Sequence, residues 1–286
     1  MSGRAAALLI VALVLCLRLP FLNQAIQGDD LYYLAAAEHA QIDPLHPNHA
    51  RYVASGVMVD MRGHPHPPLD GWVLAALLAL VGDVREVPFH AAYILFSLIA
   101  ALSVWSLARR FTQHPLAAAL LFLVTPAFVV NGGSLESDLP FLAFWLASIA
   151  LFVAAIDSGS RWMLALSAAA GAMAALAAYQ AVMLTAILVV YVWPSERRRW
   201  KAAWLAMLAA PIMICLWQLF ERLSTGALPA AVLTGYMQSY GLQTLTHKLH
   251  NAIALTGHAA WLVGPLMAAM AFSRIPKWGW AVIGIA

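Results

Sequence analysis

Charge is scarce in this sequence. Asp, Glu, Lys and Arg make up only 10% of its 286 residues, whereas 63% are hydrophobic. The mean hydropathy is +0.79. A globular core of this length could not hide so much apolar surface, so a lipid bilayer must solvate the rest. The composition excludes an ordinary soluble domain and predicts an all-α, polytopic transmembrane helical protein.

Cysteine is equally scarce. The two cysteines, Cys16 and Cys215, both lie inside apolar runs, so they give no argument for a disulfide framework or a cysteine metal knuckle. The net charge of +3 comes from short basic clusters between apolar runs. Such clusters are typical of topology signals and not of a nucleic-acid surface, so we expect membrane lipid and no nucleic acid as a partner.

Long apolar segments predict about nine membrane spans. They cover residues 5–22, 88–108, 115–131, 138–156, 162–178, 180–193, 202–220, 253–272 and 277–286. A further apolar stretch, 69–82, has only 14 residues. As a helix it would reach about 21 Å against about 30 Å of hydrocarbon, so we expect it to lie at the interface without crossing.

The basic clusters favour this topology. If Arg4 is cytoplasmic and 69–82 does not cross, the clusters at 108–110, 161, 196–201 and 273–277 all become cytoplasmic. The outer loops are then 23–87, 131–138 and 221–250, with interfacial helices in them, and residues 1–286 form a single transmembrane domain. The last apolar run has no closing charge, which indicates a truncated C-terminus. A bacterial inner or plasma membrane is the expected location.

The middles of the predicted spans contain no Asp, Glu, Lys or Arg. Polar residues gather instead at the outer ends of the spans: His90, Asp138, Tyr179, Gln180, Glu221 and His258. Ion-coupled carriers usually place charges at mid-membrane. The pattern therefore favours an enzyme or receptor with an outward-facing cavity.

Three motifs occur in order along the chain. They are "GDDLYY" at 28–33, "GHPHPPLDGW" at 63–72 and "TPAFVVNGGSLESDLPF" at 125–141. Together they resemble the GT-C class of membrane glycosyltransferases over residues 5–195, closest to the branch of dolichyl-phosphate-mannose protein mannosyltransferases and lipid A aminoarabinose transferases. The resemblance implies inverting transfer of a sugar from a polyprenyl-phosphate carrier to a hydroxyl-bearing acceptor on the outer face. That class lacks the sugar-nucleotide Rossmann fold, and a G-x-G-x-x-G stretch is absent here.

Inverting transfer needs a base that takes the proton of the acceptor. The resemblance implies that Asp29 is this base and that Asp30 orients the acceptor or assists. If a helix begins here, Tyr33 is four residues from Asp29 and shares its face, so its hydroxyl could contact acceptor or sugar. The competing interpretation is that the acids only favour the start of a helix.

The leaving lipid phosphate needs hydrogen-bond donors or positive charge. Relatives often have lysine before "PPL", and His66 stands there in this chain. A histidine can donate a hydrogen bond or carry charge. Arg51 and Arg62 in the same loop are alternatives, because arginine binds phosphate bidentately. A purely structural turn at the prolines is the other interpretation of His66.

Asp138 and Glu136 form a second acidic pair. The resemblance implies that Asp138 faces the acid of the first loop, positions the acceptor or helps to bind a metal, with Glu136 as its alternative. A divalent metal on Asp29 and Asp138 is left open, and no other cofactor is implied. The structural alternative is that Ser137 or Asp138 caps the helix that follows.

Tyr179 and Gln180 replace a lysine, glycine and proline that relatives often have at this outer turn. They could bind a sugar, and Tyr179 could equally be an interface anchor. In the third outer loop, His247 and His250 are spaced for a metal but have no clear third ligand. Two other functions remain: an uncoupled transporter or flippase for a lipid or glycolipid, and a membrane scaffold. The sugar and the acceptor (protein, lipid or glycan) are not determined.

Overall fold

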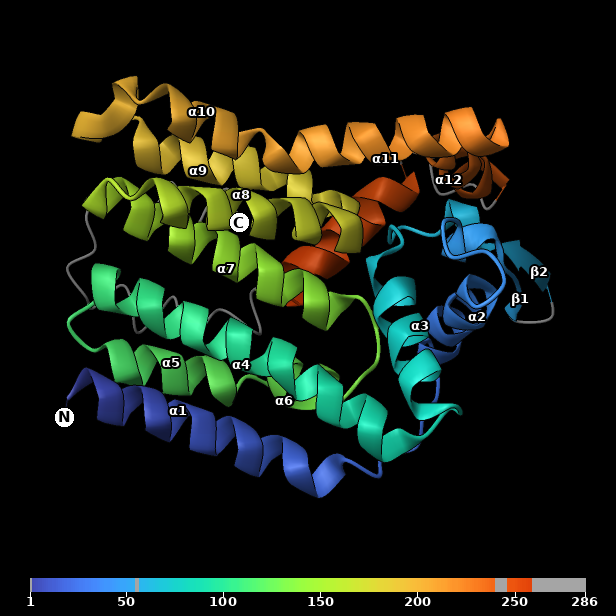
Figure 1. Ribbon diagram of the computed structural model, residues 1–286, viewed down its shortest axis with the longest axis horizontal. Helices are drawn as coiled ribbons and strands as arrows, with labels where there is room; N and C mark the ends of the chain where they lie inside the picture. The colour runs from blue at the N-terminus through green and yellow to red at the C-terminus, as the bar shows by residue number, and fades with distance from the viewer. Residues whose placement is uncertain (1, 55–56, 240–245, 259–286) are drawn as a thin grey trace.

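A computed structural model describes residues 2–54, 57–239 and 246–258 of the chain. Its long helices run side by side along one direction, and a cap of shorter elements closes one end of the bundle (Figure 1). The cap contains α2, α3, α12 and a small β-hairpin, all at the right of Figure 1. The fold is therefore a helical bundle with a mixed cap.

Three helices are long and apolar enough to cross a membrane. They are α1 (Gly3–Arg18, continued by the 3-10 turn η1, Leu19–Phe21), α4 (Glu86–Phe111) and α7 (Asp138–Ser158). Their positions confirm the predicted segments 5–22, 88–108 and 138–156. Because α1 runs toward the cap and α4 runs away from it, the cap elements between them stay at one end (Figure 1).

Within the described residues the other predicted spans are shorter or broken, and the prediction of nine spans is not confirmed. Segment 115–131 is two helices, α5 (Pro115–Leu123) and α6 (Pro126–Asn131). Pro126 starts α6, where its missing N–H costs nothing, and the Thr125 hydroxyl accepts from the Phe128 amide. Helix α8 (Arg161–Ala177), turn η4 (Tyr179–Met183) and α9 (Leu184–Val192) are also shorter than a full span.

Segment 202–220 is a bent pair, α10 (Lys201–Met207) and α11 (Ala209–Thr225), with an angle of 46° between its halves. Pro211 has no amide hydrogen for the Met207 carbonyl, which explains the break. The Thr185 hydroxyl donates to that carbonyl at 2.9 Å. If the pair counts as one span, the described residues have four candidates. Most of 253–272 and all of 277–286 lie outside the described residues.

The cap begins with α2 (Asp30–Ala40) and η2 (Pro47–His49). Strands β1 (Arg51–Ala54) and β2 (Val57–Asp60) pair antiparallel, so the expectation of an all-α fold is corrected by this hairpin. Turn η3 (Met61–Gly63) leads to α3 (Leu69–Val81), and α12 (Pro229–Ser239) packs on η3. Helix α3 ends at Gly82, whose φ of 83° favours glycine.

Small residues let α7 and α8 approach closely. The hydroxyl of Ser148 donates to the Ser167 carbonyl at 2.9 Å, and Ser167 donates back to the Ser148 carbonyl at 2.8 Å. A Cβ atom on Gly171 would lie only 3.2 Å from the Ser148 hydroxyl oxygen. Close approach of this kind is how membrane helices gain packing energy without a hydrophobic driving force.

Arg18 joins α1 to two other elements. Its Nε donates to the Ser97 hydroxyl at 3.1 Å, and its Nη atoms donate to the carbonyls of Val129 and Phe128. The guanidinium carbon also lies 4.7 Å from the centre of the Phe128 ring. This buried arginine satisfies carbonyls at the end of α6 and so positions the loop that follows.

Candidate active site

Asp30 connects the first two predicted outer loops. Its Oδ1 accepts hydrogen bonds from the Ser134 hydroxyl at 2.9 Å and from the Leu135 amide at 2.8 Å, while Oδ2 accepts from the Gln27 amide at 3.3 Å. The residue is only 3% exposed. A buried carboxylate with three donors is a strong connection, and it fixes segment 131–137 against the start of α2.

Asp29 is exposed and occupies the N-cap position of α2 without capping it through its side chain. It lies close to the second acidic pair. Burial raises the pKa of Glu136, and the negative charges of Asp30, Asp138 and Asp29 raise it further. The acids of the two loops therefore share one electrostatic environment.

Tyr33 lies buried at the centre of this group. The Ser137 backbone amide hydrogen-bonds to its hydroxyl. Burial raises the pKa of Tyr33, followed by the charges of Asp70, Asp138 and Glu136, so the phenol stays protonated. Its hydroxyl therefore remains a hydrogen-bond donor beside the carboxylates.

Two histidines pack edge-on against the Tyr33 ring. The ring centres of His64 and His66 lie 5.4 Å and 6.0 Å from it. Burial lowers the pKa of His64 to about 4, and the neighbouring His66 contributes. Burial also lowers the pKa of His66, against the opposing effects of the Ala177 carbonyl and Asp138. His64 is therefore neutral at physiological pH.

His66 has a defined tautomer when it is neutral. Its Nδ1 lies 3.0 Å from the Ala177 carbonyl oxygen, which can only accept, so Nδ1 carries the proton. The other nitrogen, Nε2, is then an acceptor. We expected neutral His66 to donate a hydrogen bond to a phosphate. Its single ring proton already lies in the hydrogen bond to the Ala177 carbonyl, so neutral His66 has no second proton to donate.

Ser137 precedes α7 but does not cap it through its side chain, contrary to the capping interpretation. Its hydroxyl donates to the Ala177 carbonyl at 2.8 Å instead. That one carbonyl thus receives both Ser137 and His66 and joins α7, α8 and the loop before α3. Asp138, in the first turn of α7, is exposed.

Asp70 is a member of this group that the sequence reasoning missed. It lies in the first turn of α3, is fully buried, and accepts a hydrogen bond from the Tyr93 hydroxyl. Its Oδ2 has no hydrogen-bond partner among the described residues. Burial raises its pKa well above the ordinary value, and Asp30, Glu136 and Asp138 raise it further. The available signal was that Asp70 is the single charged residue in the apolar stretch 69–82.

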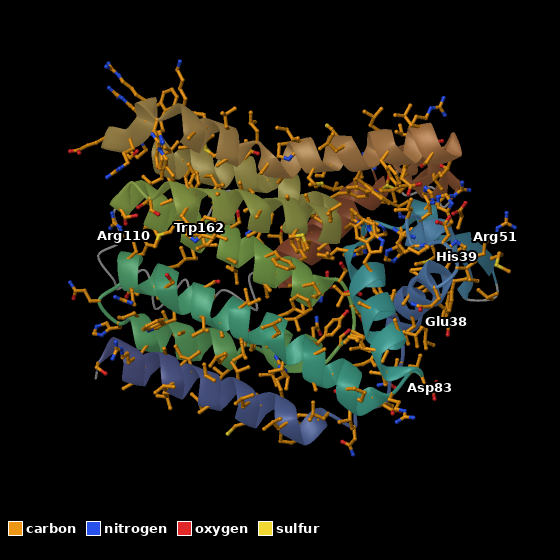
Figure 2. All side chains as sticks on the ribbon, viewed as in Figure 1. Glu38, His39, Arg51, Asp83, Arg110 and Trp162 are labelled. Carbon is orange, nitrogen blue, oxygen red and sulfur yellow. The ribbon has the colours of Figure 1, made fainter. Side chains whose placement is uncertain are left out.

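The other predicted substrate-binding residues lie around this cluster. The Tyr179 hydroxyl accepts from the Gln218 amide group at 3.0 Å, and Gln180 is exposed. Arg62 is held by Asp60, whose two oxygens both lie 3.0 Å from its Nε. Arg51 is exposed at the start of β1 and extends away from the cap (Figure 2).

A group of possible metal ligands lies elsewhere in the cap. Among the described residues, Asp43, His46 and His49 offer ligand atoms that all lie within 4.8 Å of one another. Within that same part of the chain, neither Asp29 with Asp138 nor His247 with His250 belongs to such a group.

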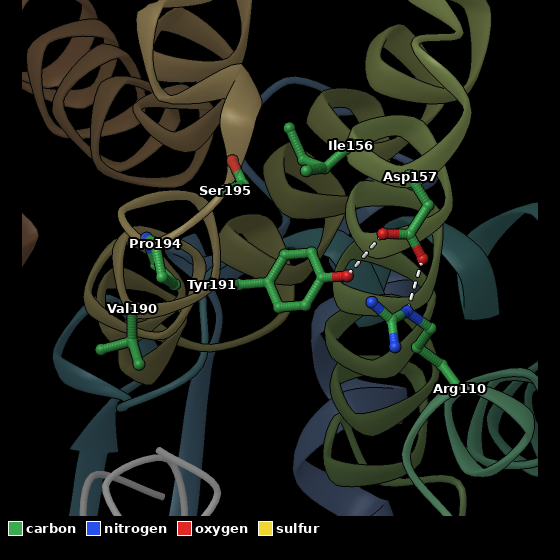
Figure 3. Close-up of a pocket in the computed structure, with 7 residues that line it drawn as sticks. All are labelled: Arg110, Ile156, Asp157, Val190, Tyr191, Pro194 and Ser195. Atoms are coloured by element: carbon green, nitrogen blue, oxygen red, sulfur yellow. Dashed lines mark hydrogen bonds and ion pairs between the residues drawn. The ribbon is translucent and has the colours of Figure 1, made fainter. Parts of the chain in front are cut away.

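A cavity of about 210 Å³ is lined by residues that include Arg110 (Figure 3), which lies at the end of the bundle opposite the cap (Figure 2). Its wall includes Arg110, whose Nε donates to Asp157 at 2.6 Å, and Tyr191, whose hydroxyl donates to the same carboxylate at 2.8 Å. This network ties together the ends of α4, α7 and α9. It contains none of the predicted site residues.

The bundle and its cap define a helical membrane protein with acidic, tyrosine and histidine side chains gathered at one end. The chain belongs to the dolichyl-phosphate-mannose-protein mannosyltransferase family, whose pattern matches residues 65–217. It is a membrane glycosyltransferase of the mannosyltransferase type, for which the family implies a polyprenyl-phosphate-linked donor and an acceptor. A search of curated proteins finds no match. The family match confirms the resemblance to GT-C enzymes. It contains His66, Asp70, Glu136 and Asp138 and begins after Asp29 and Asp30.

Proposed function

We propose that this protein is an inverting glycosyltransferase that moves a sugar from a polyprenyl-phosphate carrier to an acceptor hydroxyl on the outer face of the membrane. The observation that carries the proposal is the connection through Asp30. It brings the exposed Asp29 of the first loop beside Glu136 and Asp138 of the second. Two carboxylate-bearing loops around a protonated tyrosine suit a reaction that must remove one proton and position two substrates.

The proposed base is Asp29, because it is the exposed member of the acidic pair, whereas Asp30 is buried and already accepts three hydrogen bonds. Asp138, with Glu136, would position the acceptor from the opposite side. The Tyr33 hydroxyl would donate to a sugar or acceptor oxygen. Tyr179 and Gln180 would contact the sugar from the turn after α8.

The proposed contact with the carrier phosphate involves Arg51. The Arg62 guanidinium is committed to Asp60, and His64 is neutral at physiological pH, whereas Arg51 extends from the cap (Figure 2). His66 in its neutral form offers Nε2 as an acceptor for a sugar hydroxyl. In this arrangement the positively charged Arg51 would bind the phosphate, and the Nε2 acceptor of His66 would bind a sugar hydroxyl.

The proposed orientation of the protein in the membrane follows from the distribution of its basic residues. The end of α4 and the starts of α8 and α10 lie at the left of Figure 1, opposite the cap. These turns include Arg109, Arg110, Arg161 and the run 197–199. By the positive-inside rule we infer that this end is cytoplasmic and that the cap lies outside.

The test is release of free polyprenyl phosphate from a panel of polyprenyl-phosphate sugars by the purified protein in nanodiscs. Asp29→Asn should lower the rate by about 10²- to 10⁴-fold with donor binding retained. Asp138→Asn should mainly raise the KM for the acceptor. Asp83→Asn is the matched control, because Asp83 is exposed between α3 and α4.

Equal losses in Asp29→Asn and Asp83→Asn would contradict the assignment of the base. Absence of release from every donor, together with movement of labelled lipid across vesicles, would support an uncoupled flippase instead. Absence of donor binding as well would leave the scaffold interpretation.

A further inference from the structure

The group formed by Asp43, His46 and His49 lies on the segment between α2 and β1, outside the proposed active site. The Nδ1 of His46 lies 2.8 Å from the Asp43 Oδ2, and the rings of His46 and His49 stack with their centres 4.7 Å apart. All three residues are partly buried. Two imidazoles and one carboxylate are ligands that zinc binds readily.

The hydrogen bonds of His46 bear on which ring nitrogen carries the proton. When the Ser224 hydroxyl donates to the Phe220 carbonyl, 2.7 Å away, its oxygen accepts from the His46 Nε2 at 2.9 Å, and Nδ1 of the neutral ring has no proton. The unprotonated Nδ1 then faces a carboxylate oxygen, and two acceptors at 2.8 Å repel each other. A cation between them, either a second proton or a metal ion, removes this repulsion.

The environment of His49 matches the outer shell of a metal site. Its Nε2 lies 2.9 Å from Oε2 of Glu221. Glu221 is 1% exposed, and its Oε1 has no hydrogen-bond partner among the described residues. Metal-bound histidines commonly donate their other N–H to a carboxylate, which fixes the ring and strengthens the ligand. With Nε2 engaged in this way, Nδ1 is the nitrogen that His49 has left for a metal.

We propose that Asp43, His46 and His49 bind one zinc ion through Oδ2 and the two Nδ1 atoms, with water in the fourth position. Glu221 and Ser224 of α11 orient the two imidazoles through their Nε2 atoms. The ion ties the segment after α2 to the outer end of α11, two elements far apart in sequence. It is a structural connection of the cap and does not depend on the proposed glycosyl transfer.

The experiment titrates the metal-stripped full chain in detergent with zinc chloride by calorimetry, and with cobalt(II) as a spectroscopic probe. We expect one zinc per chain, visible cobalt bands of a four-coordinate site, and a higher unfolding temperature when zinc is added. His46→Gln and His49→Gln should weaken zinc binding by more than about 100-fold, since each removes a ligand. His114→Gln, an exposed histidine on the far side of the bundle, is the matched control.

Glu221→Gln keeps all three ligands and tests the outer shell separately. It should weaken zinc binding by about 10- to 100-fold and still give one ion per chain. Glu221→Gln also tests the proposal if a variant of His46 or His49 fails to fold. Zinc binding that is unchanged in His46→Gln, His49→Gln and Glu221→Gln, or that never saturates at one ion per chain, would overturn the proposal. In that case the group is a set of hydrogen-bonded pairs without a metal.

Discussion

Asp29 and Asp30 are neighbours, yet the same substitution should affect them in different ways. Asp30 accepts three hydrogen bonds, so Asp30→Asn leaves one carbonyl oxygen for Ser134 and Leu135 and turns an NH₂ group toward the Gln27 amide. Bonds to a charged group contribute about 1.5–3 kcal/mol and neutral ones about 0.5–1.5 kcal/mol. Each retained bond therefore weakens by about 1 kcal/mol. The third is lost, and because it is long at 3.3 Å it contributes only about 1 kcal/mol.

The total is about 3 kcal/mol for Asp30→Asn. At about 2–4 °C per kcal/mol for chains of this order of size, the unfolding temperature should fall by about 6–12 °C. Asp29→Asn removes no hydrogen bond that caps α2, so its stability should change by less than about 0.5 kcal/mol. Its rate of sugar transfer should nevertheless fall by about 10²- to 10⁴-fold if Asp29 is the base.

The assay pairs thermal unfolding with release of polyprenyl phosphate for both variants in the same nanodiscs. Glu38→Gln, an exposed acid on the same helix, is the control for loss of a negative charge (Figure 2). If both Asp variants lose stability equally, or if Asp30→Asn unfolds at the wild-type temperature, the connection through Asp30 is not what holds the loops together. If Asp29→Asn keeps full activity, the assignment of the base is wrong.

Three further predictions concern buried polar groups. Because burial raises the pKa of Asp70 above its ordinary value of 3.8, the wild type should lose stability as the pH rises above 3.8, and Asp70→Asn should remove this part of the pH profile in unfolding measurements. Because burial lowers the pKa of His64 from 6.5 to about 4, wild-type stability should fall as the pH drops from 6.5 toward 4. His64→Gln should remove this pH dependence of the unfolding temperature, and an unchanged profile would contradict the reasoning. Arg18→Met should cost about 2–4 kcal/mol by leaving carbonyls at the end of α6 unpaired, whereas Arg4→Met, at an exposed position, should cost less than about 0.5 kcal/mol.

The active-site hypothesis was partly accessible from sequence because charge is so rare in this chain. When few carboxylates interrupt long apolar runs, each one marks a boundary or a site, and the resemblance to GT-C enzymes then singled out Asp29 and Asp138. Asp70 was missed because it stands near the start of an apolar stretch, where local pattern gives an acid no partner. Only the packing of α4, which brings Tyr93 against Asp70, shows that this carboxyl is fully buried.

The division of roles between adjacent residues was not accessible from sequence. Asp29 and Asp30 are the same residue type one position apart, and a motif cannot say which of them points toward the second loop. The contacts of Asp30 with Ser134 and Leu135 join positions more than a hundred residues apart. Similarly, Ser137 was a reasonable cap by position, but the nearby Ala177 carbonyl competes for its hydroxyl.

The sequence by itself determined the solvent, the class of secondary structure and the family motifs. Apolar composition forces burial in lipid, and in lipid a backbone satisfies its own polar groups best as helices. Only the tertiary structure decided which carboxylates are buried, which nitrogen of His66 carries the proton, and that Asp43, His46 and His49 meet Glu221. Burial, pKa and hydrogen-bond partners depend on distances between segments remote in the chain, and local pattern does not encode those distances.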